Sequence, residues 1–153
     1  MTKPRAVIFD IDGTLANCDH RRHLVDFKNY ENTGKKNWDE FKRLASIDTP
    51  IGDIVELLRH FYLLGFAIVL CTGRSSDQYG QTYDWLKRYG IGFDDLFMRE
   101  PGCFRPDDVV KRELLALIRK KYDPYLVVDD RDSVVAMWRS EGLTCLQCAP
   151  GNF

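Results

Sequence analysis

Four short apolar runs alternate along the chain with longer stretches of helical periodicity. The predicted strands are Ala6 to Phe9, Phe66 to Cys71, Tyr125 to Val128 and Leu143 to Leu146, and the predicted helices span residues 50–64, 77–89, 108–121 and 131–141. Because a parallel pair of strands needs a long connection, usually a helix, this alternation predicts a doubly wound α/β fold with a parallel sheet. A chain of 153 residues has the size of a single domain, residues 1–153.

The ends of the predicted helices carry ordinary boundary residues. Thr49 and Pro50 fit the N-cap and first position of the first helix, and either Asp107 or Asp108 fits the N-cap of the third. Glycines follow three of the helices, at positions 65, 90 and 142. These boundaries support the predicted alternation.

Composition excludes several classes of partner and location. The chain has 22 basic and 23 acidic residues, so its net charge of −1 produces no general attraction to nucleic acid or anionic lipid, although a local basic patch remains possible. The apolar run from Phe61 to Cys71 is shorter than the roughly 20 residues that cross a bilayer. Asp10 and Asp12 interrupt the first apolar stretch before a signal-peptide core could form. We expect a cytoplasmic protein without a membrane partner.

The cysteines and histidines give weak signals. Five cysteines, an odd number, indicate reduced thiols rather than a disulfide framework. Cys145 and Cys148 form a CxxC, but residues three apart on a strand point to opposite faces, which argues against zinc or redox use. We expect His20, His23 and His60 to be solvated.

A long insertion follows the first predicted strand. Residues 15–49 exceed the usual connection of roughly 2 to 6 residues, and insertions of this length are commonly lids or binding elements. The insertion contains the aromatic residues Phe27, Tyr30, Trp38 and Phe41 among several lysines and arginines. We predict a small helical cap whose aromatic side chains pack on each other and which also acts as a lid.

Polar residues end three of the predicted strands, at Asp10 to Thr14, Thr72 to Arg74 and Asp129 to Asp132. Ligands of doubly wound sheets bind beyond the carboxyl ends of the strands. Several carboxylates meeting there repel one another unless a cation lies among them, and Mg²⁺ prefers such oxygen ligands. Asp10 and Asp12 would share one face of an extended chain, so one could be a nucleophile and the other a general acid and base.

Two basic residues are also candidates for binding phosphate. Lys111 is expected in the first turn of its helix, where the macrodipole disfavours a cation, so a phosphate or the carboxylates should compensate it. Arg74, after Thr72 and Gly73, could hold phosphate oxygens with two nitrogens at once. The sequence contains no P-loop motif, which argues against that mode of ATP binding.

The motifs together resemble the haloacid dehalogenase (HAD) superfamily of phosphotransferases. Asp10-Ile11-Asp12-Gly13-Thr14 matches the nucleophile motif, Thr72 the second, Lys111 the third and Asp129-Asp130 the fourth. The resemblance implies that Asp10 attacks phosphorus to form an aspartyl phosphate. It also implies that Asp12 protonates the leaving oxygen and later activates water. An aspartate at this second position is typical of the phosphatases and argues against a dehalogenase.

The same resemblance implies a set of ligands. Mg²⁺ would be held by Asp10, the backbone carbonyl of Asp12, and Asp129, with Asp130 assisting. Thr72 and Lys111 would fix and neutralise the phosphoryl oxygens.

Almost the whole chain is similar to the phosphatase domain of the bacteriophage polynucleotide kinase/3′-phosphatase family. The similar segments are Val7 to Ala16, Arg105 to Glu113 and Val127 to Phe153. The resemblance implies that further pocket residues fall on Arg21, Arg74, Arg99 and Asp107, beside Gly73. A kinase half is not among these residues, so repair would need a separate kinase or ligase.

Three functions are open at this point. The first is a Mg²⁺-dependent phosphatase acting on 3′-phosphates of DNA or RNA ends, with Arg21, Arg99 and Arg105 near the polynucleotide backbone. The second is a small-molecule or mononucleotide phosphatase, which the near-neutral charge favours. The third is a phospho-accepting receiver module, in which the order of the acidic motifs is the reverse of the one found here. The sequence does not indicate an oligomeric state.

Overall fold

A parallel sheet of five strands, in the order β5-β4-β1-β6-β7, forms the centre of the molecule in a computed structural model that describes residues 2–25 and 36–153. The strands are β1 (Arg5–Phe9), β4 (Ala67–Ser75), β5 (Asp95–Arg99), β6 (Asp123–Asp129) and β7 (Cys145–Gln147). The chain moves outward from β1 through β4 to β5 and then returns to place β6 on the other side of β1. The predicted doubly wound fold is confirmed, and its switch point lies between β1 and β6.

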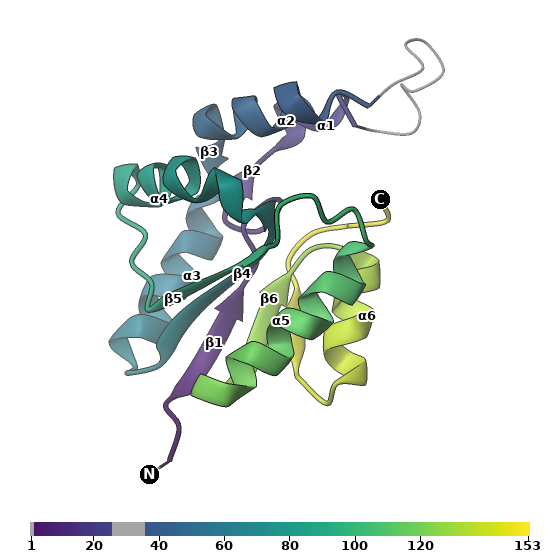
Figure 1. Cartoon of the computed structure of the whole chain (residues 1–153). Coiled ribbons are helices and arrows are strands. Elements are labelled where there is room, and N and C mark those ends of the chain that lie inside the picture. The colour runs from purple at the N-terminus through teal and green to yellow at the C-terminus, as the bar shows by residue number, and fades with distance from the viewer. Residues whose placement is uncertain (1, 26–35) are drawn as a thin grey trace.

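Helices cover both faces of the sheet (Figure 1). They are α3 (Gly52–Leu63), α4 (Tyr79–Arg88), α5 (Asp107–Lys121) and α6 (Asp132–Ser140). Because side chains alternate across a strand, the sheet separates two cores. In β1, Val7 and Phe9 pack with residues of α3 and α4, whereas Ala6 and Ile8 pack with residues of α5 and α6.

Several predicted boundaries are wrong. β5 was not expected, and β4 continues past Cys71 to Ser75, with an irregular register between Thr72 and Ser75 where it pairs with β5. Pro50 belongs to the short strand β3 (Thr49–Pro50), so Ile51 and not Thr49 is the N-cap of α3. α5 already begins at Asp107 after Pro106, so neither Asp107 nor Asp108 is its N-cap.

The insertion forms a small unit above the carboxyl ends of the strands (Figure 1). Its described elements are β2 (Ala16–Asn17), α1 (Asp19–Arg22), α2 (Trp38–Leu44), the 3-10 turn η2 (Ala45–Ile47) and β3, which pairs antiparallel with β2. Trp38 and Phe41 meet edge to face with ring centroids 5.7 Å apart, as expected of the cap aromatics. Phe27 and Tyr30 lie outside the described residues.

The second half of the insertion is fastened to α4. The side chain of Gln81 donates to the carbonyls of Lys42 and Arg43 at 3.0 Å each. Arg88 donates to the carbonyl of Ser46 at 2.9 Å, and the indole of Trp85 donates to the carbonyl of Asp48 at 2.8 Å. Four hydrogen bonds thus hold this half of the cap against the body of the domain.

Candidate active site

Three buried carboxylates meet where β1 and β6 end. Asp10 directly follows β1, Asp129 ends β6, and Asp130 comes next. One carboxylate oxygen of each lies within 4.8 Å of the others. Because β1 and β6 are hydrogen-bonded neighbours, as in the bond from the Asp10 backbone N–H to the Val128 carbonyl at 3.0 Å, the sheet itself brings these distant residues together.

Lys111 is buried beside this cluster. Its Nζ donates to Asp10 at 2.8 Å and to Asp129 at 2.9 Å, and lies 3.7 Å from Asp107. Burial alone would lower the pKa of Lys111, but these carboxylates raise it well above its usual value. Lys111 lies one residue deeper in its helix than predicted, and its compensating partners are carboxylates.

The cluster still carries more negative than positive charge. Burial, together with Asp129 and Asp130, raises the pKa of Asp10 well above its usual value despite the opposing effect of Lys111. Burial and Asp129 likewise raise the pKa of Asp130 to about 6. Three hard oxygen donors in one buried volume, with one ammonium to balance them, therefore fit a divalent cation.

Asp129 is held in a fixed orientation. Its Oδ1 accepts the backbone N–H groups of Asp130 at 2.9 Å and Arg131 at 3.3 Å. Its Oδ2 accepts the buried indole N–H of Trp138 at 3.1 Å as well as Lys111. Such support orients a carboxylate toward a metal and tunes its affinity.

Asp10 and Asp12 lie beyond the end of β1. The strand ends at Phe9, and the chain then turns tightly, with the N–H groups of Thr14, Leu15 and Ala16 all directed to the carbonyl of Ile11. That the two side chains share one face stays a prediction. The turn aims Asp10 at Lys111 and Asp12 at two arginines.

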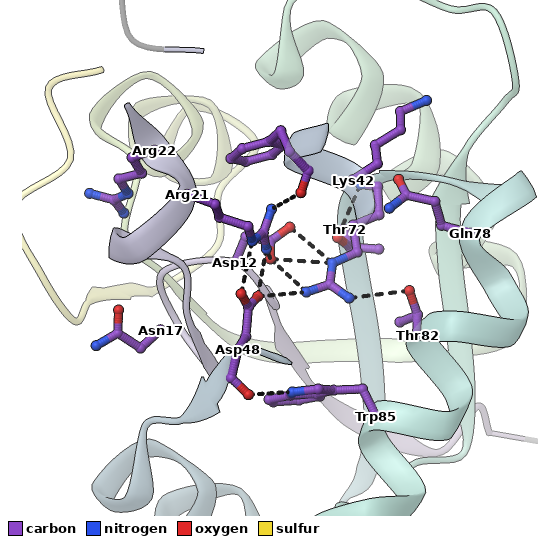
Figure 2. A network of polar contacts seen from close by, with 12 residues as sticks. Asp12, Asn17, Arg21, Arg22, Lys42, Asp48, Thr72, Gln78, Thr82 and Trp85 are labelled. Atoms are coloured by element: carbon purple, nitrogen blue, oxygen red, sulfur yellow. Dashed lines mark hydrogen bonds and ion pairs between the residues drawn. The ribbon is translucent and has the colours of Figure 1, made fainter. Parts of the chain in front are cut away.

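The arginines that bind Asp12 are Arg21 and Arg74. Figure 2 shows Asp12 beside Arg21. Arg74 grips the carboxylate of Asp12 through Nε at 3.0 Å and Nη2 at 2.7 Å, and Nη2 of Arg21 approaches it to 2.6 Å. Burial alone would raise the pKa of Asp12, but Arg74 and Arg21 hold it well below its usual range. Arg74, expected to hold phosphate, is here bonded to protein groups, including the hydroxyl of Thr82 at 3.3 Å.

Asp48 joins the same network and was not singled out in the sequence. It is fully buried and accepts hydrogen bonds from both arginines. His20 is exposed to solvent, as expected, and its Nε2 also lies 2.8 Å from Oδ1 of Asp48. No local pattern marks Asp48, because its partners come from other segments of the chain.

The remaining predicted site residues line the same edge of the sheet. Thr72 is buried and its hydroxyl accepts the backbone N–H of Arg74 at 3.1 Å. Arg99 donates to the carbonyl of Gly73 at 3.0 Å and to Asp107 at 3.0 Å. Gly73 allows this packing, because a Cβ there would lie 2.3 Å from Oδ1 of Asp107.

Arg22 is a further cation near the cluster that the sequence did not indicate. Its Nη2 lies 3.5 Å from Oδ2 of Asp130, and its guanidinium lies over the ring of Phe153 at 4.2 Å. Arg131 lies over the same ring at 4.9 Å. An aromatic ring flanked by two guanidiniums therefore borders the carboxylates.

All five cysteines fall within the described residues and carry free thiols, as expected. Cys148 lies near the site, where its Sγ is 3.6 Å from the hydroxyl of Thr14. Within residues 2–25 and 36–153, the group of three metal-ligating side chains is the aspartate cluster and includes no cysteine or histidine.

Among the helices of the described residues, none has both the length and the apolar character that a membrane span needs.

Comparison with known proteins identifies the family of the chain. The family model of the polynucleotide kinase PNKP phosphatase domain matches residues 4–153. The chain belongs to this HAD phosphatase family. It is therefore a phosphatase domain, and the receiver module is excluded.

Individual relatives agree with this assignment. A protein of Autographa californica nuclear polyhedrosis virus, named as a bifunctional polynucleotide kinase/RNA ligase, is 33% identical over 144 residues, which cover 89% of this chain and 18% of the viral protein. A chain in the solved structure of the Pnkp1/Rnl/Hen1 RNA repair complex is 32% identical with a TM-score of 0.79, over 99% of this chain and 44% of that one. The chain thus spans less than half the length of these relatives.

A more distant structure shows the fold alone. The class C acid phosphatase from Bacillus anthracis is 16% identical with a TM-score of 0.72, over 99% of this chain and 68% of that enzyme. The arrangement of sheet and helices is thus shared well beyond the close relatives.

Proposed function

We propose that the chain is a Mg²⁺-dependent phosphomonoesterase that removes 3′-phosphates from polynucleotide ends. The observation that carries the proposal is the buried group of Asp10, Asp129, Asp130 and Lys111 at the sheet switch point of a PNKP-type phosphatase domain. Phosphoryl transfer asks a protein mainly for positioning and charge stabilisation, and this group supplies both.

Asp10 is the proposed nucleophile. Its carboxylate lies at the carboxyl end of β1 and is oriented by Lys111 at 2.8 Å and by the hydroxyl of Thr14 at 3.3 Å. Attack on phosphorus forms an acyl phosphate on Asp10 and releases the substrate oxygen, and water then cleaves the acyl phosphate. Each of these two half-reactions therefore makes one bond to phosphorus and breaks another.

Asp10, Asp129 and Asp130, together with the backbone carbonyl of Asp12, would hold Mg²⁺. When bound, the ion neutralises charge on the phosphoryl oxygens. Lys111 contributes a second positive charge at the same place. In this proposal Thr72 and Arg74 contact the phosphoryl group, and Arg74 exchanges part of its hold on Asp12 for the incoming anion.

Asp12 is the proposed acid and base. It delivers a proton to the leaving oxygen in the first half and takes one from water in the second. Its pairing with Arg21 and Arg74 keeps it ionised before substrate arrives, so Asp12 must first take up a proton, from solvent or from a singly protonated substrate phosphate, before it can act as the acid. A substrate anion that draws these guanidiniums away favours its protonated form.

A polynucleotide end as the substrate is supported by the family and by relatives whose names concern polynucleotide kinase and RNA repair. The insertion above the site (Figure 1) is the proposed cap that selects the leaving group. It carries Arg21 in α1, and Arg99 lies at the end of β5. A separate kinase or ligase would complete repair. The net charge of −1 favours the second candidate, a phosphatase acting on mononucleotides or other small molecules.

The test measures phosphate release from a 3′-phosphorylated oligonucleotide, its 5′-phosphorylated counterpart and free 3′- and 5′-mononucleotides, with and without Mg²⁺. We expect a preference for the 3′-phosphorylated oligonucleotide, and equal or faster turnover of mononucleotides would exclude the repair role. Asp10→Asn should remove turnover while leaving the circular dichroism spectrum unchanged. Near-normal turnover by this variant would exclude Asp10 as the nucleophile.

A further inference from the structure

Asp48, Arg21, Asp12 and Arg74 form a square of alternating charges on the cap side of the site, buried except at Asp12, whose side chain is 25% exposed. Figure 2 shows Asp48 within this network. Asp48 lies at the end of η2, at the point where the insertion returns to the body of the domain. Its carboxylate is fully buried, and so is the guanidinium of Arg21. A carboxylate in such a place is normally retained only when it is paired and hydrogen-bonded.

The geometry of the square is specific. Arg21 binds Asp48 with two nitrogens, Nε to Oδ1 at 2.8 Å and Nη2 to Oδ2 at 2.5 Å. Arg74 binds Asp12 in the same two-nitrogen manner. Each arginine also reaches the other carboxylate, Arg21 to Asp12 at 2.6 Å and Arg74 to Asp48 at 3.3 Å. Forked contacts of this kind fix direction as well as distance.

The charges balance only when Asp48 is present. Asp12 and Asp48 supply two negative charges for the two guanidiniums. Without Asp48, both arginines would have Asp12 as their remaining carboxylate in this square, and Arg21 would lose its two-nitrogen partner. The guanidiniums would then move toward Asp12 and turn its carboxylate.

We propose that Asp48 is a positioning residue for Asp12, acting through Arg21 and Arg74. This inference rests on the proposed function, in which Asp12 exchanges protons with the leaving group and with water. The carbonyl of Asp48 is fixed by the indole of Trp85 on α4, so docking of the cap on the body of the domain completes the surroundings of Asp12. The cap therefore contributes to the chemistry of the site through a residue that touches no substrate.

The kinetic test compares two substrates of one enzyme. An alkyl phosphate, such as a 3′-phosphorylated oligonucleotide, needs a proton on its leaving oxygen, whereas 4-nitrophenyl phosphate releases a stable phenolate without one. We compare kcat/KM, because it covers only the steps up to release of the leaving group, whereas both esters share the later hydrolysis step. We expect Asp48→Asn to lower kcat/KM for the alkyl ester about 10²-fold, the size of a lost general acid, and kcat/KM for the aryl ester only a few fold. Equal losses on both substrates would overturn the proposal, because a merely structural defect lowers both alike.

Asp48→Glu and Glu40→Gln complete the set of variants. Asp48→Glu keeps the charge, so it should recover part of the selective loss, and it serves as the test variant if Asp48→Asn does not fold. Glu40→Gln removes an exposed carboxylate of α2 that pairs with Arg43 and should leave both rates unchanged. If Asp48→Glu had the same ratio of alkyl-ester to aryl-ester rate as Asp48→Asn, the negative charge at this position would not be what positions Asp12, and the proposal would be overturned.

A second measurement needs no substrate and so separates this proposal from the proposed function. The arginine Nε–H signals in NMR spectra of the whole chain report the contact of Arg74 with Asp12, and Arg43 provides an exposed reference. We expect slow exchange of the Arg74 signal in the wild type and a displaced chemical shift of that signal in Asp48→Asn, because the guanidinium moves on Asp12 once its contact with Asp48 is lost. An unchanged Arg74 signal would overturn the role of Asp48 even if the enzyme proves active. A wild type inactive on both esters would instead refute the proposed function.

Discussion

Replacing Gly13 with alanine tests how tightly the turn after β1 packs against the carboxylate cluster. Gly13 has a φ of +85°, a conformation that costs other L-residues about 1–2 kcal/mol. An added Cβ would lie 2.1 Å from Oδ2 of the buried Asp130, and overpacking of this kind costs about 1–3 kcal/mol. We therefore expect Gly13→Ala to lower the free energy of unfolding by about 2–5 kcal/mol, the sum of both effects.

Two other glycines separate these contributions. Gly65 has a φ of +86° with nothing within 4 Å of an added Cβ, so Gly65→Ala should lose only the backbone contribution, about 1–2 kcal/mol. Gly73 is not among the positive-φ glycines, but its Cβ would lie 2.3 Å from Oδ1 of Asp107, so Gly73→Ala should lose only the contact contribution, about 1–3 kcal/mol.

The assay is urea unfolding followed by tryptophan fluorescence, with the free energy obtained by linear extrapolation and the m-value unchanged among the variants. Gly13→Ala should also raise the Mg²⁺ concentration needed for half-maximal activity, because it displaces Asp130. A loss of stability no larger than that of Gly65→Ala would refute the close packing of this turn on Asp130.

Three further outcomes are expected. Trp138→Phe removes a hydrogen bond to Asp129 and should raise half-saturating Mg²⁺ about tenfold in an activity titration, whereas an unchanged titration would contradict its supporting role. Removal of divalent ions with EDTA should abolish phosphate release, and Mg²⁺ should restore it; activity that persists in EDTA would exclude metal dependence. Thiol labelling should modify Cys103 first, since the backbone N–H and the side chain of Arg105 lower the pKa of Cys103, whereas burial raises the pKa of Cys145 to about 12. Arg105→Ala keeps the backbone contribution and loses the guanidinium, so labelling of Cys103 should begin at a somewhat higher pH in this variant than in the wild type. Equal labelling in both proteins would contradict the effect of Arg105.

The sheet and its catalytic edge were predictable because each depends on local pattern. Continuous apolar runs mark β1, β4 and β6, and the carboxylates that end β1 and β6 meet because parallel strands place their carboxyl ends at one edge. The edge strand β5, Asp95–Arg99, was missed because its apolar run has only three residues, Leu96 to Met98, and lies between charged ends without regular alternation. Pro50 was misplaced because its pairing with Ala16 outweighs its preference for a first helical turn.

The sequence by itself determined the order of strands and helices, the acidic residues at the strand ends and the kinship with a phosphatase family. Only the tertiary structure decided that Asp12 pairs with Arg21 and Arg74 whereas Asp10 pairs with Lys111, and that Asp48 belongs to the network of Asp12. The reason is physical. Apolar periodicity acts over a few neighbouring residues, whereas these ion pairs join groups 27 and 62 positions apart, and their burial depends on how the cap docks on the sheet.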